Sequence, residues 1–202
     1  MYNKLIILSM VLFITACSSL KPQSVPQQAT YTLQDSASTI FTTRPTSHTL
    51  LVSAPVANPG YDSSNMIYTQ AQHPYQLQSY TRHQWVAPPA DMLLPLLANR
   101  LSNRNYFHAV VTPPHAGITD RRLDTRLISF KQEFSKRHAS RAHIMLRAEL
   151  INNDSSKVIA SRLFEVETLA PSNDPQGNVI ASNDAISKLL SQITEFAVRN
   201  SG

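Results

Sequence analysis

The stretch His143-Ile144-Met145-Leu146-Arg147-Ala148-Glu149-Leu150-Ile151 decides the fold class of this 202-residue chain. Ile144, Leu146, Ala148 and Leu150 alternate with His143, Met145, Arg147 and Glu149, which is the period of a strand whose side chains point to opposite faces. An alternation of this kind is typical of an antiparallel sheet with one face covered. The stretch therefore predicts one long strand in a sheet that a second layer covers.

The segments on either side extend the same sheet and supply its cover. Residues 123–134 and 157–168 are two more long extended candidates, and the polar run 152–156 predicts a hairpin between the second and third strands. A final helix is predicted behind Asn183-Asp184. The apolar residues that recur in it at helical spacing are Ile186, Leu189, Leu190, Ile193, Phe196 and Ala197.

The N-terminal half predicts shorter elements. Strand-like segments cover 29–33, 47–53, 65–70, 75–80 and 107–111, and the proline-containing run 54–62 predicts a surface loop. A helix is expected over 89–101 because Leu93, Leu97 and Leu101 form one stripe, and Pro95 should kink it or mark its true start. Together these segments predict an α+β fold: an antiparallel sheet of several hairpin-connected strands, covered on one face by two main helices.

The first 28 residues predict a membrane anchor. Lys4 precedes an apolar run of ten residues, which is too short to span a bilayer and is typical of a signal peptide over 1–16. Ile14-Thr15-Ala16-Cys17 resembles the lipobox of bacterial lipoproteins, in which the cysteine thiol takes a diacylglycerol and the new N-terminus an acyl chain. An ordinary signal peptide with a buried Cys17 is the alternative. We expect a lipidated Cys17 with a tether over 17–28, and a single domain over 29–202.

The residues after Cys17 predict the membrane. Ser18 and Ser19 follow it, without the aspartate that usually retains bacterial lipoproteins at the inner membrane. The expected location is therefore the outer membrane, with the domain facing the periplasm.

Composition excludes several classes of site. One cysteine cannot form a disulfide within the chain or a thiolate metal site, and four scattered glycines cannot form a dinucleotide or phosphate loop. No Gly-x-Ser-x-Gly elbow is present, and no two of the seven histidines have the spacing of helical metal ligands. The sequence predicts no catalytic site, no metal and no cofactor other than the lipid on Cys17.

Basic and aromatic residues are the candidates for binding. Residues 121–147 carry eight Lys or Arg against two acids, so a basic face could contact anionic lipid or an acidic partner, or could simply be solvated. Nucleic acid is not expected for an exported chain without an aromatic-basic motif. The candidate contact residues are Arg121, Arg122, Arg126 and Arg147, with Tyr61, Tyr68, Tyr80 and Trp85, although these aromatic residues could instead fill the core.

Several segments, taken in order, resemble the ABC-type transport auxiliary lipoprotein family. They are Tyr31-Thr32-Leu33, Pro55, Pro59-Gly60-Tyr61-Asp62-Ser63-Ser64-Asn65-Met66-Ile67-Tyr68, Leu77-Gln78-Ser79-Tyr80, Trp85-Val86-Ala87-Pro88-Pro89-Ala90-Asp91-Met92-Leu93, Leu123-Asp124, Phe130-Lys131-Gln132-Glu133-Phe134 and Ala160-Ser161-Arg162-Leu163-Phe164. Tyr61 stands where the family usually has leucine.

The resemblance implies an auxiliary subunit of an ABC-type intermembrane lipid transport system. Such a subunit would dock a periplasmic conduit protein of the mammalian-cell-entry type at the outer membrane, and some family members are expected to form homo-oligomeric rings. Two other functions stay open at this point. The chain could be a periplasmic lipid-binding carrier or envelope-stress sensor with its own apolar pocket, or an envelope enzyme of unknown type.

Overall fold

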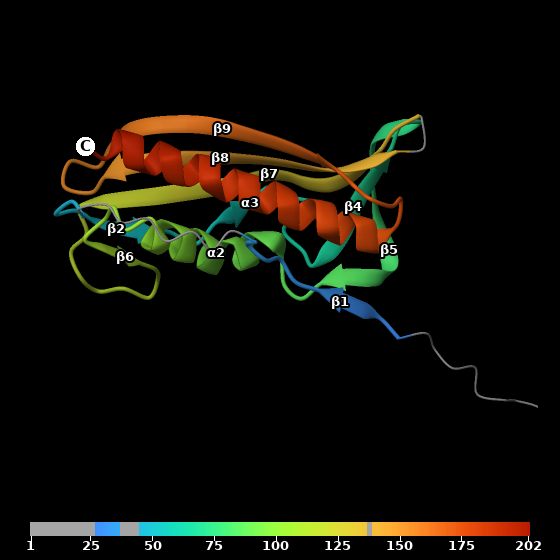
Figure 1. The fold of residues 1–202 in the computed structure, drawn as a ribbon, viewed down its shortest axis with the longest axis horizontal. Coiled ribbons are helices and arrows are strands. Elements are labelled where there is room, and N and C mark those ends of the chain that lie inside the picture. Colours follow the sequence, from blue (N-terminus) through green and yellow to red (C-terminus); the bar gives the residue numbers. More distant parts are fainter. Residues whose placement is uncertain (1–26, 37–44, 137–138) are drawn as a thin grey trace, which may run out of the picture.

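The computed structural model describes residues 27–36, 45–136 and 139–202, which form one mixed sheet with two helices on one of its faces (Figure 1). The expected α+β class is confirmed. The strands are β1 (Ala29–Tyr31), β2 (Thr49–Val52), β3 (Val56–Ala57), β4 (Asn65–Gln70), β5 (His73–Trp85), β6 (Ala109–Val111), β7 (Arg121–Phe134), β8 (Ser140–Asn152) and β9 (Lys157–Leu169), and the helices are α2 (Pro89–Asn103) and α3 (Pro175–Asn200).

Strand β7 organises the sheet. On one edge it pairs with β8, which pairs with β9, and both pairings are antiparallel as the sequence predicted. On its other edge β2, β3 and β4 follow one another along its length, and all three run parallel to it. Strand β6 continues the sheet beyond β2, while β5 and then β1 continue it beyond β4.

The sheet is therefore mixed, whereas the sequence predicted antiparallel pairing throughout. Hairpin connections are local and can be recognised from turn residues, but a parallel pair joins segments that are distant in the chain. The β2–β7 pair aligns Leu50 with Arg121, a separation that no local pattern encodes.

The segment 54–62, predicted as a surface loop, contains the short strand β3. Val56 aligns with Arg126 and Ala57 with Leu127, and Asn58 N–H donates to the Leu127 carbonyl at 2.8 Å. Pro55 and Pro59 flank this pairing, so proline limits the length of the strand without preventing it.

Helix α3 begins at Pro175, eight residues before Asn183, where the sequence predicted its start. Asp174 caps it by accepting a hydrogen bond from Gly177 N–H at 2.7 Å, and Pro175 occupies the first turn, where its missing donor costs nothing. Helix α2 runs from Pro89 through Pro95 to Asn103. Pro95 lies on the exposed side, so water can satisfy the carbonyl that loses its helical partner.

The core lies between the sheet and the two helices. Ile144, Leu146, Ala148 and Leu150 are buried as predicted, and so are Leu93, Leu97 and Leu101 of α2. The six apolar positions predicted for the last helix are all buried on α3. Because side chains alternate along β7, β8 and β9, their remaining residues form the face that points away from the helices, which we call the outer face.

The predicted signal peptide over 1–16, Cys17 and the tether up to residue 26 lie outside the described residues. Within the described part of the chain, neither helix combines the length and the apolar character that crossing a membrane would require.

Candidate functional site

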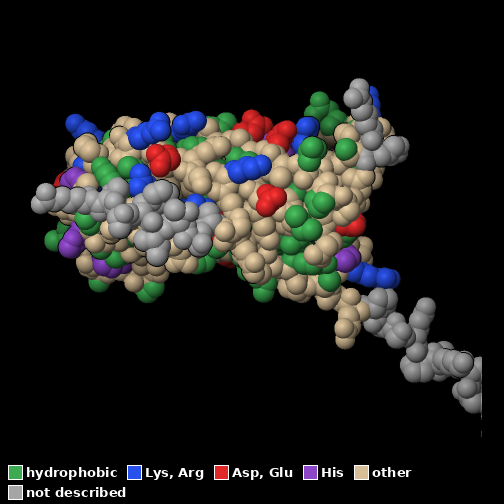
Figure 2. All heavy atoms as spheres, in the orientation of Figure 1, with side chains coloured by type: hydrophobic (Ala, Val, Ile, Leu, Met, Phe, Trp, Pro, Cys, Tyr) green, Lys and Arg blue, Asp and Glu red, His purple; other side chains and the backbone are tan. Residues whose placement is uncertain are grey.

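An open hollow of about 590 Å³ lies where the β4–β5 hairpin meets the start of α3. We call it the aromatic hollow, because Tyr68, Tyr80 and Phe134 line it beside Asp174 and Pro175. Figure 2 shows hydrophobic side chains gathered at this end of the molecule, where the hairpin of β4 and β5 lies in Figure 1. The structure thus brings together two of the predicted contact residues, Tyr68 and Tyr80.

The rings of the hollow pack on one another. Tyr68 lies 4.8 Å from Tyr80 and 5.8 Å from Phe134 between ring centroids, with a tilted and an edge-on geometry respectively. Tyr80 OH donates to Gln132 Oε1 at 2.7 Å, and Gln132 Nε2 donates to Ser140 Oγ at 2.8 Å. Burial, followed by the charges of Tyr68 and Asp174, raises the pKa of Tyr80 to about 12. Tyr80 is therefore a neutral hydrogen-bond donor at physiological pH.

His83 lies next to Tyr80, and Asp174 lines the hollow at the start of α3. His83 lies edge-on to Tyr80 at 6.1 Å between ring centroids, and Tyr31 OH lies 3.1 Å from His83 Nδ1. The Asp174 pKa is lowered, chiefly by the hydrogen bond from Gly177 N–H and then by that from Ser172 Oγ, so the helix cap is anionic. Aromatic faces with polar tips beside a charged cap suit a protein or lipid contact, because such side chains tolerate both apolar and wet surroundings.

The other two predicted aromatic residues do not join the hollow. Trp85 is only 1% exposed and packs edge-on against Phe130 at 5.5 Å between ring centroids, so it is a core residue. Tyr61 is partly buried and packs against the core cluster. For these two, the core alternative left open by the sequence is the one the structure supports.

The outer face is charged but not basic. Residues of β9 supply acids opposite the cations of β7 and β8, so the excess positive charge of 121–147 does not describe this face. Its cations and anions are equal in number: Arg122, Arg126, Lys131, Arg141 and Arg147 against Asp124, Glu133, Glu149, Glu165 and Glu167. The basic face expected from residues 121–147 is therefore corrected to a face on which basic and acidic side chains are interspersed.

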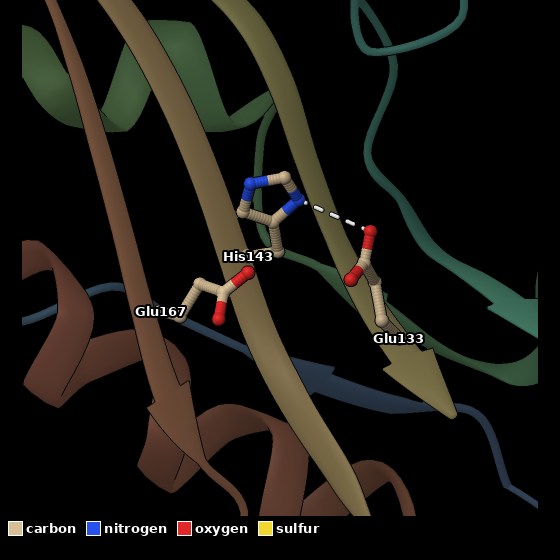
Figure 3. Close-up of side chains that lie close together, drawn as sticks. All are labelled: Glu133, His143 and Glu167. Carbon is tan, nitrogen blue, oxygen red and sulfur yellow. Dashed lines mark hydrogen bonds and ion pairs between the residues drawn. The ribbon is translucent and has the colours of Figure 1, made fainter. Parts of the chain in front are cut away.

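One cluster on the outer face surrounds His143. Figure 3 shows its ring on β8 between Glu133 of β7 and Glu167 of β9. Nδ1 lies 3.1 Å from Glu133 Oε1, and Nε2 lies 2.7 Å from Glu165 Oε1. Both ring nitrogens of His143 therefore lie within hydrogen-bond distance of a carboxylate oxygen.

Cations complete this cluster. Lys131 Nζ lies 2.8 Å from Glu133 Oε1, and Arg141 approaches Glu133 at 3.3 Å and Glu167 at 3.2 Å. Burial by itself raises the pKa of Glu133, but the hydrogen bond and charge of Lys131, with the charge of His143 and the hydrogen bond from Arg141, outweigh burial and lower it. Glu133 is therefore an anion held by three basic groups.

The same cluster contains the group of the described residues whose donor atoms could meet on a metal. One atom each of Glu133, His143 and Glu167 lie within 4.8 Å of one another. Lys131 and Arg141 already bind these carboxylates, so a metal ion would have to displace two cations. The donor set therefore fits an ion-pair network better than a metal centre.

Three of the four predicted arginines line a second, open groove of about 450 Å³, which we call the arginine groove. Arg122, Arg126 and Arg147 border it together with Val56, Asp124 and Glu149. Arg121 lies apart from it and donates from Nη1 to the Asp120 carbonyl at 3.3 Å. The groove forms beside the segment 53–55, which joins β2 to β3 alongside β7.

Sequence reasoning missed several of these residues. Phe134 and Asp174 complete the hollow, and Glu165 and Glu167 neutralise the outer face, but the sequence analysis did not name any of the four as a site residue. A cap signal existed in Asp174-Pro175, where an acceptor precedes a proline suited to the first helical turn. The acids of β9 also carried a signal, because Glu165 and Glu167 alternate with buried Phe164 and Val166.

A family model described as the ABC-type transport auxiliary lipoprotein component matches residues 31–194. The chain belongs to this family. The match spans the described domain from β1 into α3, so this auxiliary lipoprotein carries the family's fold over most of its length. The family is one of transport auxiliary components rather than of enzymes. No curated protein sequence matches the chain.

Two solved structures share the fold of this family member. The crystal structure of protein XCC0632 from Xanthomonas campestris superposes with a TM-score of 0.75 at 23% identity, covering 85% of this chain and 96% of that one. The crystal structure of a protein described only as uncharacterized superposes with a TM-score of 0.65 at 13% identity, covering 84% and 98%. At these identities the likeness concerns the fold alone.

Proposed function

We propose that the protein is a non-enzymatic auxiliary subunit of an ABC-type intermembrane lipid transport system, anchored in the outer membrane through lipid chains on Cys17. In this role it docks a periplasmic conduit protein of the mammalian-cell-entry type at that membrane. The observation that carries the proposal is the family match over residues 31–194, which supports a transport auxiliary role.

The aromatic hollow is the docking surface in this proposal. Tyrosine is enriched at the centres of protein interfaces, because its ring buries a large area while its hydroxyl keeps a hydrogen bond. Tyr68 and Tyr80 present such rings at an open surface, and Phe134 adds an apolar floor. The hollow thus suits an apolar segment of the conduit protein that carries one or two polar groups.

Crosslinking in cells tests the proposal. The full chain, tagged at Gly202, is crosslinked gently, extracted with a mild detergent and analysed by mass spectrometry. We expect a conduit-type membrane protein to co-purify, and crosslinks between copies of the chain would report the homo-oligomer that the family resemblance implies. Reproducible recovery of a solitary monomer would overturn the proposed function.

Two matched substitutions test the hollow itself. Gln72→Arg adds a long cation at the rim of the hollow, in the exposed turn between β4 and β5. Gln192→Arg makes the same change on the exposed side of α3, about 25 Å along the helix from Pro175. We expect Gln72→Arg to reduce the recovered conduit protein and Gln192→Arg to leave it unchanged. Equal recovery with both variants would exclude the hollow as the docking surface.

A further inference from the structure

A row of four side chains crosses the outer face at the arginine groove. In the sheet register Val56 of β3 aligns with Arg126 of β7, Arg126 with Arg147 of β8, and Arg147 with Leu163 of β9. Neighbouring strands lie about 4.8 Å apart, so the row spans roughly 14 Å. Two cations at its centre are flanked by two apolar side chains, which are exposed by 52% for Val56 and 42% for Leu163.

The two central arginines oppose one another without a counter-ion. Directly opposite residues of an antiparallel pair have Cβ atoms about 5 Å apart, and like charges there are unfavourable. Neither Arg126 nor Arg147 forms an ion pair or a side-chain hydrogen bond with any residue that the structure describes. No direct ion pair within the described residues therefore offsets the repulsion between these two arginines.

The two acids of the neighbouring row, Asp124 and Glu149, already accept hydrogen bonds from other side chains. Asp124 accepts hydrogen bonds from Ser53 Oγ at 2.6 Å and from Arg122 Nε at 2.9 Å. Glu149 accepts one from Ser161 Oγ at 3.2 Å. The groove holds three arginines and these two acids, so its net charge is positive. An anion that binds in it is repelled by the two carboxylates and should therefore bind at the arginine row.

We propose that Arg126 and Arg147 bind the phosphate group of a phospholipid, with Val56 and Leu163 contacting its glycerol and the first methylenes of its acyl chains. Guanidinium groups bind phosphate through paired hydrogen bonds, and two of them facing one another can share its oxygens. The flanking apolar pair matches the part of a lipid that adjoins the phosphate. The site is distinct from the aromatic hollow, so it does not depend on which partner docks there.

A titration of the full chain in an uncharged detergent tests the site. The probes are dihexanoyl phosphatidylglycerol, a short-chain phospholipid, and inorganic phosphate, with binding followed by calorimetry. We expect the short-chain lipid to bind, more weakly as salt is raised, and inorganic phosphate to bind at least about tenfold more weakly because it lacks the apolar contacts. Equal affinity for both probes would reduce the site to a general phosphate site and overturn the lipid assignment.

Matched charge variants separate the site from the overall charge of the protein. Arg126→Gln with Arg147→Gln should weaken lipid binding by about tenfold or more. Arg82→Gln with Arg199→Gln removes two exposed arginines elsewhere and should leave binding within about twofold. Equal losses in the two double variants, or no binding by the native protein, would overturn the proposal.

The stability of the free protein provides a second readout. If the arginine pair serves to bind a ligand, replacing both arginines by glutamine should leave the thermal midpoint of the free protein unchanged or raise it, because the repulsion between them disappears. The short-chain lipid should then raise the midpoint of the native protein more than that of the Arg126→Gln, Arg147→Gln variant. A lower midpoint in the double variant without ligand would show that the arginines stabilise the fold, and would contradict the inference.

Discussion

Glu133 shows how a single carboxylate is tuned on the outer face. It accepts a hydrogen bond from Lys131 and faces Arg141 and His143, so three basic groups favour its charged form. Their combined effect lowers its pKa below the ordinary 4.5, although burial opposes them. A lowered pKa in the folded state means that folding favours the anion, so acid should weaken the fold.

We predict that Glu133→Gln makes the protein less sensitive to acid. The contribution of Glu133 is fully present above pH 4.5, the value for the unfolded chain, and is lost as pH falls through the lower pKa of the folded state. At pH 7 the variant should melt up to about 2 to 4 °C lower, since partly exposed ion pairs contribute at most about 1 kcal/mol. The difference from the native protein should shrink on acidification to about pH 3.

Thermal unfolding followed by circular dichroism from pH 7 to pH 3 measures this effect. Glu195→Gln is the matched control, because the Glu195 carboxylate lies 3.6 Å from Arg104 and 3.7 Å from Arg199, farther than Lys131 lies from Glu133. If the difference in melting temperature between Glu133→Gln and the native protein stays constant or widens below pH 4.5, the lowered pKa of Glu133 is contradicted.

The aromatic residues show what a sequence can decide about single side chains. The family-like segments drew attention to Tyr68, Tyr80 and Trp85 alike, yet Trp85 is buried against Phe130 while the two tyrosines line an open hollow. Which of them is exposed depends on where α3 begins and on which strand lies beside β5. Both are long-range features, so local pattern alone could not separate core from site.

Helix α3 is fastened at its start by a close approach of the preceding chain. A Cβ at Gly177 would lie 2.1 Å from the Ser172 carbonyl oxygen, a backbone atom that cannot rotate away. The same turn places the Asp174 carboxylate 2.7 Å from Gly177 N–H. Glycine is required here by space, because its own backbone angles are helical.

We predict that Gly177→Ala destabilises the protein although alanine favours helix by about 1 kcal/mol over glycine. The added methyl must push residues 172–174 away and loosen the Asp174 cap, and overpacking of this kind costs about 1 to 3 kcal/mol. Urea unfolding followed by circular dichroism should show a lower midpoint for Gly177→Ala. Gln176→Ala, at the exposed neighbouring position, should change it little. An unchanged or higher midpoint for Gly177→Ala would mean that the turn has room.

The elements differ in how far the sequence determined them. Strand β8 and the last helix were predicted correctly in their buried faces, because period two and period 3.6 are local signals. The parallel placement of β2, β3 and β4 along β7 was not predicted, since short strands of four, two and six residues take their register from a distant partner. Pro95 does not mark the start of α2, which begins at Pro89 and continues through Pro95 because this residue lies on the exposed side of the helix.

At the scale of the molecule, acids on β9 balance much of the positive charge that residues 121–147 carry on β7 and β8. Glu165 and Glu167 approach His143 and Arg141 across the sheet, which a linear count of charges cannot show. Among the residues that the structure describes, the cations of the outer face without an ion pair are Arg126 and Arg147. Local composition thus predicted where arginines are, and three-dimensional pairing determined which of them are available.

The N-terminal chain enters the domain at one end and is fixed there. Strand β1 pairs with β5 beside the aromatic hollow, and Asp35 then binds Arg100 of α2 with its two carboxylate oxygens at 2.5 and 2.7 Å. In Figure 1 β1 lies at the end opposite the C-terminus. An anchor on Cys17 would therefore hold the domain by the end that carries the hollow, within the reach of a tether of about a dozen residues, at most roughly 40 Å.

We predict that Cys17→Ser releases the protein from membranes while the domain still folds. A thioether-linked diacylglycerol needs the cysteine sulfur, and stable anchoring needs two or more acyl chains, so serine at this position removes the anchor. Fractionation of cells, a high-salt wash and mass measurement of the recovered chain should show an unacylated protein in the soluble fraction. Ser18→Ala, which keeps the thiol, should remain in the membrane fraction.

A third variant separates anchoring from location. Ser18→Asp keeps Cys17 but supplies the aspartate that usually retains bacterial lipoproteins at the inner membrane, so it should stay acylated and shift to inner-membrane fractions on a density gradient. If Cys17→Ser stays bound after the salt wash, the anchor does not depend on lipid. If Ser18→Asp and the native chain fractionate together, the outer-membrane location fails while the anchor stands. The paired outcomes matter because docking a conduit at the outer membrane requires both.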